Sequence, residues 1–86
     1  MRLEFEKEFE REAGKLPLQT QERLAAALDL LFQNPFDSRL HTKPLSGVLS
    51  GIFSFRIGRD YRALFRFVDT RVIMLMRVKH RRYIYR

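Results

Sequence analysis

The sequence predicts an α+β domain in which a small antiparallel sheet packs on a helical hairpin, with the elements in the order β-α-α-β-β-β. Three observations predict this fold. Apolar residues recur at helical spacing in the N-terminal part of the chain, they alternate with polar residues in the C-terminal part, and turn-forming residues separate the two parts. With 86 residues, the chain is expected to form a single domain, residues 1–86.

The N-terminal part predicts one short strand and two helices. Residues 2–5 alternate polar and apolar side chains, as a half-buried strand does. Helical spacing follows, and Pro17 separates a first helix from a second one over residues 18–32, which Asn34 and Pro35 end. The second helix is expected to bury a continuous apolar stripe of Leu24, Ala25, Leu28, Leu31 and Phe32.

The C-terminal part predicts three strands, over residues 53–57, 61–68 and 71–79. The first two alternate apolar and polar side chains, which predicts one buried face for each. The third is apolar almost throughout and is therefore expected to be a central strand, buried on both faces. Residues 35–51 are expected to form a loop, and a loop of this length in a compact domain is usually functional.

Positive charge gathers in the second half of the chain. The net charge is +7; residues 1–38 hold five Lys or Arg and eight Asp or Glu, whereas residues 39–86 hold twelve and two. Such segregation predicts a basic face that binds a polyanion. Most of these cations are arginines, whose planar guanidinium can donate two hydrogen bonds to one phosphate. Nucleic acid is therefore the expected partner.

Other features of the sequence exclude several classes of site. The absence of cysteine excludes disulfides, thiolate metal sites and a cysteine nucleophile, and it fits a reducing compartment. Two histidines and scattered acids give no ligand cluster, so neither a metal nor another cofactor is expected. The charged N-terminal segment differs from a signal peptide, and the apolar runs are far shorter than the ~20 residues that cross a bilayer. The expectation is a soluble, cytoplasmic protein without a membrane partner.

An arginine pair is expected on the polar face of the first predicted hairpin. Arg56 and Arg62 both lie opposite the phenylalanine face of their strands, and an antiparallel pairing could bring them close together. Like charges that face each other across a hairpin destabilise it. The pair therefore favours a phosphate-binding role over a merely solvated surface.

Three short motifs lie in the second half of the chain: KPLSG at residues 43–47, RIGRDYR at residues 56–62 and HRRYIY at residues 80–85. Together with the order of the elements, they resemble the K-P-L-x-G loop, the R-x-G-x-x-Y-R hairpin and the H-R-x-x-x-Y ending of the RelE/ParE superfamily of type II toxin–antitoxin toxins. Each motif alone is weak. Because all three occur in order and at similar spacing, the combination is fairly specific.

The resemblance implies a toxin that a cognate antitoxin neutralises by wrapping it. RelE-like members cut messenger RNA in the ribosomal A site, where the 2′-hydroxyl of the substrate attacks the adjacent phosphate without a metal. ParE-like members have the same fold but inhibit DNA gyrase and lack the ribonuclease residues. We expect a ribosome-dependent mRNA endoribonuclease; the alternatives are a gyrase inhibitor and a basic nucleic-acid-binding module without toxicity.

The ribonuclease reading assigns roles to individual residues. The resemblance places Arg62 at the transition-state phosphate, with Arg56 and Arg81 assisting, and Tyr85 against a base or the phosphate. His80 is the expected general acid or base, because an imidazole can give or take a proton near neutral pH. The remaining expected RNA-binding residues are Lys43, Arg59, Lys79, Arg82, Tyr83 and Arg86.

The chain also departs from the catalytic patterns of the superfamily. Some members supply a glutamate from the strand region, but no glutamate follows Glu22. Others use lysines on the first hairpin strand, where this chain has Ser54 and Arg56. Arginine is a poor base because it stays protonated. The general base is therefore either His80 or missing, and a missing base would favour the gyrase alternative.

Overall fold

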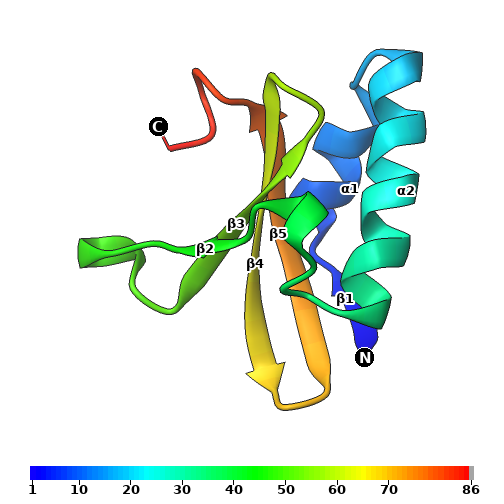
Figure 1. Ribbon diagram of the computed structural model, residues 1–86. Coiled ribbons are helices and arrows are strands. Elements are labelled where there is room, and N and C mark those ends of the chain that lie inside the picture. Colours follow the sequence, from blue (N-terminus) through cyan, green and yellow to red (C-terminus); the bar gives the residue numbers. More distant parts are fainter. Residues whose placement is uncertain (86) are drawn as a thin grey trace.

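The computed structural model describes residues 1–85 and confirms the α+β class and the predicted order of the main elements (Figure 1). Arg86, which is expected to bind RNA, lies outside the described residues. The elements are β1 (Arg2–Phe5), α1 (Lys7–Gly14), α2 (Leu18–Gln33), the 3-10 turn η1 (Ser38–Leu40), β2 (Lys43–Pro44), the 3-10 turn η2 (Gly47–Leu49), β3 (Ile52–Ile57), β4 (Tyr61–Asp69) and β5 (Val72–His80).

The sheet has the strand order β1-β5-β4-β3-β2. Strands β2 to β5 pair antiparallel, whereas β1 runs parallel to β5, so the prediction of a wholly antiparallel sheet is wrong for this one pair. Both helices lie between β1 and the other strands in sequence, and parallel neighbours require a crossover connection of this kind. The prediction that β5 is a central strand is confirmed, since it lies between β1 and β4. The prediction that it is buried on both faces is wrong, because Met74 and Met76 are only partly buried.

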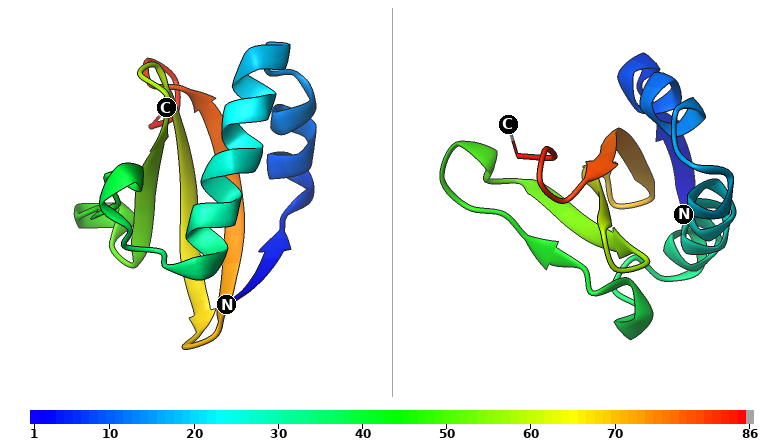
Figure 2. Two further views of the ribbon diagram at one scale, coloured as in Figure 1. Left: turned by 45° about the vertical axis from the view of Figure 1, so that its right-hand side comes forward. Right: turned by 90° about the horizontal axis from the view of Figure 1, so that it is seen from above.

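Helices α1 and α2 cover one face of the sheet, and the C-terminal residues lie on the other side (Figure 2). The helix-covered face buries the core, in which Leu31, Phe55 and Phe65 have no exposed surface. Helix α2 buries Leu24, Ala27 and Leu31 toward it. Neither helix of the described chain has the length and apolar character needed to cross a membrane.

Two residues of the predicted stripe on α2 are exposed rather than buried. Ala25 lies on the surface and Phe32 is 53% exposed. Each follows a buried leucine, Leu24 or Leu31, by one position. One position turns an α-helix by about 100°, so the side chain that follows a buried leucine points away from the sheet.

The predicted loop over residues 35–51 has local structure that fixes two polar side chains. Buried Leu40 anchors η1, and the next residue, His41, has a positive φ of 51°. Strand β2 then pairs Lys43 with Ser54 and Pro44 with Phe53 at the outer edge of β3. The KPLSG motif therefore begins as an edge strand of the sheet.

Candidate active site

A cavity of about 230 Å³ lies on the open face of the sheet. Side chains from β2, β3 and β4, from the preceding turn and from the C-terminal residues line it: His41, Lys43, Ser54, Arg56, Arg62, Arg81 and Tyr85. We call it the arginine cavity. It brings together Lys43 and four of the five expected catalytic residues; His80 does not line it.

The strand register explains why these side chains meet. Arg56 pairs with Arg62 across the β3–β4 hairpin, as the alternation predicts. Lys43 pairs with Ser54 two residues earlier on β3, so Ser54 and Arg56 share the open face. The Arg81 amide donates to the Asp60 carbonyl at 2.7 Å, which turns the C-terminal residues back over the sheet.

The arginine cavity concentrates positive charge around Arg62. Its guanidinium donates to the carbonyls of Arg59 and Tyr61, each at 2.9 Å. Burial lowers the pKa of Arg62 from its ordinary value, and the charges of Arg56 and Arg81 lower it further. Arginine stays protonated in proteins, so the three guanidinium groups repel one another until an anion binds among them.

No carboxylate lines the arginine cavity among residues 1–85. Asp60 approaches Arg81 at 3.9 Å from the neighbouring turn, and both side chains are about half exposed. The described chain also holds no group of three or more His, Asp or Glu side chains that could bind a metal ion. The chemistry of the lining is therefore that of an anion site.

His80 lies at a second cavity, on the helix-covered side of the sheet. It pairs with Tyr61 on β4, which lines the same cavity, whereas the next residue of β4, Arg62, lines the arginine cavity, so His80 and Arg62 lie on opposite faces of the sheet. The His80 ring lies 5.4 Å from the Tyr61 ring and 6.1 Å from the Tyr83 ring, between centroids. The structure thus separates the expected base from the expected phosphate ligands.

A sequence profile described as the ParE toxin of type II toxin–antitoxin system, parDE, matches residues 3–85. The chain belongs to this toxin family. No curated protein sequence matches the toxin. The resemblance to the RelE/ParE superfamily is thereby confirmed.

Solved structures share the fold over nearly the whole toxin. YafQ from E. coli strain BL21(DE3) has a TM-score of 0.80 at 15% identity and covers 100% of both chains. A chain of the RelB–RelE antitoxin–toxin complex from Methanococcus jannaschii has a TM-score of 0.75 at 25% identity, over 95% of the toxin and 94% of that chain. A chain of the complex RelBE2 from Mycobacterium tuberculosis has a TM-score of 0.63 at 32% identity, over 93% and 96%.

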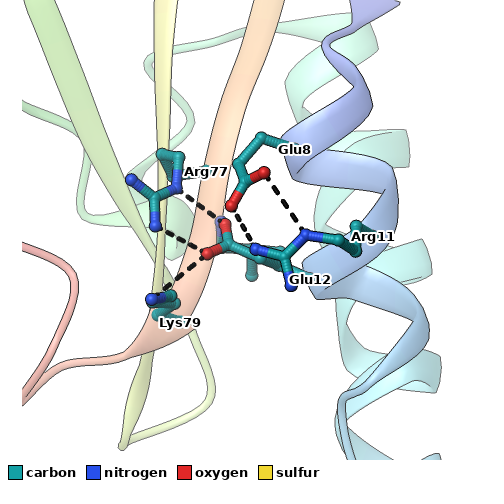
Figure 3. Close-up of polar contacts among 6 residues, drawn as sticks. Glu8, Arg11, Glu12, Arg77 and Lys79 are labelled. Carbon is teal, nitrogen blue, oxygen red and sulfur yellow. Dashed lines mark hydrogen bonds and ion pairs between the residues drawn. The ribbon is translucent and has the colours of Figure 1, made fainter.

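Glu12 of α1 makes hydrogen bonds and ion pairs with the C-terminal half of β5 (Figure 3). Its carboxylate accepts hydrogen bonds from Arg77 at 2.9 and 2.7 Å and from the Val78 amide at 3.1 Å, and it pairs with Lys79 at 3.4 Å. Burial raises the pKa of Glu12, but these hydrogen bonds outweigh burial and set it below the ordinary value of 4.5. Because β1 pairs with β5 only as far as Phe5, Glu12 takes the place of a strand neighbour beyond that point.

His41 and Ser54 also line the arginine cavity, although neither is among the site residues expected from the sequence. A signal for Ser54 was present, because it alternates in phase with Arg56 on β3. The only indication for His41 was weak: it lies two residues before Lys43, so both could face the same side of an extended segment. The other expected RNA-binding residues lie elsewhere: Arg59 and Arg82 are exposed in turns, and Lys79 and Tyr83 line the second cavity.

Proposed function

We propose that the toxin is a ribosome-dependent mRNA endoribonuclease whose reaction takes place in the arginine cavity. The observation that carries the proposal is the convergence of Arg56, Arg62 and Arg81 on one cavity without a carboxylate lining it among the described residues. A phosphodiester fills such a site, because preorganised cations stabilise the extra charge of a pentavalent phosphate. The fold shared with YafQ and RelE supports the same reading.

The reaction begins when the 2′-oxygen of the substrate attacks the adjacent phosphorus. His41 accepts the 2′-proton, because it is the histidine that lines the arginine cavity in the described chain. The phosphorus–O5′ bond breaks as the 2′-oxygen bond forms, which leaves a 2′,3′-cyclic phosphate, and Lys43 protonates the departing 5′-oxygen. The arginines stabilise the transition state, and Tyr85 orients the phosphate. His80 takes no part in this step.

The proposed partners are the ribosome with its mRNA, and a cognate antitoxin. Several matching structures are toxin–antitoxin complexes, among them RelB–RelE and DinJ–YafQ. A toxin with a net charge of +7 needs a compensating acidic surface when its basic face is covered. We therefore expect an acidic or amphipathic antitoxin segment, whose affinity falls as salt is added. We propose the cytoplasm as the place of action.

Primer extension on a reporter transcript, after brief induction of the toxin in cells, tests the proposed function. Wild type is expected to cut at codon-phased positions, and His41→Gln is expected to lower the cutting rate by about 10²–10⁴-fold, as for loss of a general base. Arg71→Gln, an exposed residue in the β4–β5 turn that lines neither cavity described above, is the control and should cut as wild type does. Growth arrest with intact transcripts would reject the ribonuclease.

Inhibition of DNA gyrase is the second candidate function. Two observations favour it: the matching profile is that of a ParE toxin, and the His80 ring lies outside the arginine cavity. A supercoiling assay with purified gyrase decides between the two. Inhibition of supercoiling without transcript cleavage would replace the proposed function with this one.

A further inference from the structure

The second cavity, which we call the rim pocket, has about 330 Å³ of space. This volume lies within the range of roughly 300–1,000 Å³ that small ligands occupy. The residues that line the pocket come from the start of β4, the end of β5 and the residues after it, α1 and the connection to α2. Three rings and three cations are among the side chains that line it: Tyr61, His80, Tyr83, Arg11, Lys15 and Lys79.

The lining of the rim pocket suits a nucleobase with its phosphate. The ring of Tyr83 is accessible, since this residue is 52% exposed, and it lies beside the ring of His80. Aromatic side chains of this kind stack on bases of any sequence. Two of the three lining cations are already paired, Arg11 with Glu8 and Lys79 with Glu12. Among the described residues, Lys15 is therefore the lining cation that the pocket offers to a phosphate.

The rim pocket and the arginine cavity lie on opposite faces of the same strand end. Tyr61 and Arg62 are consecutive on β4, and the first lines the rim pocket while the second lines the arginine cavity. The edge between the two is formed by the β3–β4 turn and the residues after β5, where Arg59, Arg81 and Arg82 are all exposed. A single-stranded RNA that passes round this edge stays in contact with cations.

We propose that the rim pocket binds the base of a nucleotide that flanks the scissile phosphate in the same RNA strand. The base stacks on the ring of Tyr83, the ring of His80, inclined to it by 56°, packs against the edge of the base, and Lys15 is the phosphate contact. This inference rests on the proposed function, because the RNA in the arginine cavity brings the flanking nucleotide to the pocket. His80 then acts through the packing of its ring and not through a proton.

The test uses a single-stranded DNA oligonucleotide that carries the fluorescent base 2-aminopurine at successive positions. It cannot be cut by the proposed reaction because it has no 2′-hydroxyl. Wild type is expected to quench the fluorescence at one position, and Tyr83→Ala and His80→Ala are expected to lose the quenching and bind about 5- to 150-fold more weakly. Tyr83→Phe and His80→Phe should bind as wild type does. Phe32→Ala, an exposed ring at the far end of α2, is the control for loss of an aromatic.

Each outcome bears on the inference separately from the proposed function. Unchanged quenching and affinity in Tyr83→Ala, with a native circular dichroism spectrum, would overturn the inference even if transcripts are cut. So would an effect of Tyr83→Ala on antitoxin binding alone, since the rim pocket would then be a protein-docking surface. Failure of the phenylalanine variants to restore binding would also overturn it. Quenching that depends on Tyr83 supports base binding in the rim pocket even where wild type leaves transcripts intact. That second result rejects the ribonuclease, and with it the position beside a scissile phosphate, but not the base-binding site.

Discussion

The two faces of the sheet differ in what their side chains do, although the same strands supply both. On β4, Ala63 and Phe65 are fully buried toward the helices, whereas Arg62, between Tyr61 and Ala63, lines the arginine cavity. On β3, Phe55 is fully buried and the next residue, Arg56, is exposed in the cavity. Successive side chains of a strand point to opposite faces. One position can therefore stabilise the fold while its neighbour contributes to the proposed activity. Substitutions at neighbouring positions should therefore have separable effects.

The largest effect on stability is expected from Phe65→Ala, on the helix-covered face. Phe65 has no exposed surface and packs on the rings of Phe53 and Phe55. Its truncation should lower the free energy of unfolding by about 3–5 kcal/mol, a large part of the stability of a domain this small. Urea unfolding followed by circular dichroism measures this loss. A loss below 1 kcal/mol would contradict the contrast between the two faces.

Arg62→Ala, on the open face, should lower RNA cleavage and leave the stability of the fold nearly unchanged. Cleavage should fall by about 10²–10³-fold, because one donor to the transition-state phosphate is lost. The urea midpoint should change little, since the variant loses two hydrogen bonds to backbone carbonyls but also removes a charge that Arg56 and Arg81 repel. The matched control is Arg66→Ala, which removes an arginine of the same strand that lies outside the cavity. Equal loss of cleavage in both variants would show a general charge effect instead of a site.

A smaller effect on stability is expected from a substitution of Glu12, whose buried carboxylate joins α1 to β5. Glu12→Gln keeps the side-chain shape but removes the charge that Arg77, Lys79 and the Val78 amide share. Hydrogen bonds to charged groups contribute about 1.5–3 kcal/mol, and the unfolding free energy should fall by that order. Glu8→Gln is the control on the same helix, because the Glu8–Arg11 pair is exposed. Exposed pairs contribute little, so the unfolding midpoint of Glu8→Gln should match that of wild type.

Much of the fold could be predicted because helical and strand periodicities are local. The parallel pairing of β1 with β5 could not be predicted. It depends on how the two helices pack against the sheet, which local periodicity does not reveal. The α2 stripe was misplaced at Ala25 and Phe32 for another reason. Residues 25–27 are all alanine, and small side chains mark the buried side of a helix only weakly.

The candidate site could be predicted where register is regular, and not where it shifts. The alternation around the β3–β4 turn correctly placed Arg56 opposite Arg62. Strict alternation from Leu75 would put His80 on the open face. However, Leu64 pairs with Arg77 while Phe65 pairs with Leu75, so the strand contains one extra residue at this point. A bulge of one residue exchanges the two faces for all residues beyond it, and it turns His80 toward Tyr61.

The smallest effect on stability is expected from Asp37→Asn, in the turn that precedes His41. Asp37 accepts hydrogen bonds from the backbone and side chain of Arg39, and these lower the pKa of Asp37 from 3.8 to about 2. A lowered pKa in the folded state means that the ionised carboxylate stabilises the fold above pH 3.8 and that this contribution is lost as the pH falls through about 2. Asp37→Asn should therefore be slightly less stable than wild type at pH 7, and the difference should vanish near pH 2. Thermal melts between pH 2 and 5 compare the two proteins directly, and Glu12 titrates alike in both. A difference that stays constant over this range would show that the Asp37 charge does not hold the turn, and that buried Leu40 anchors it alone.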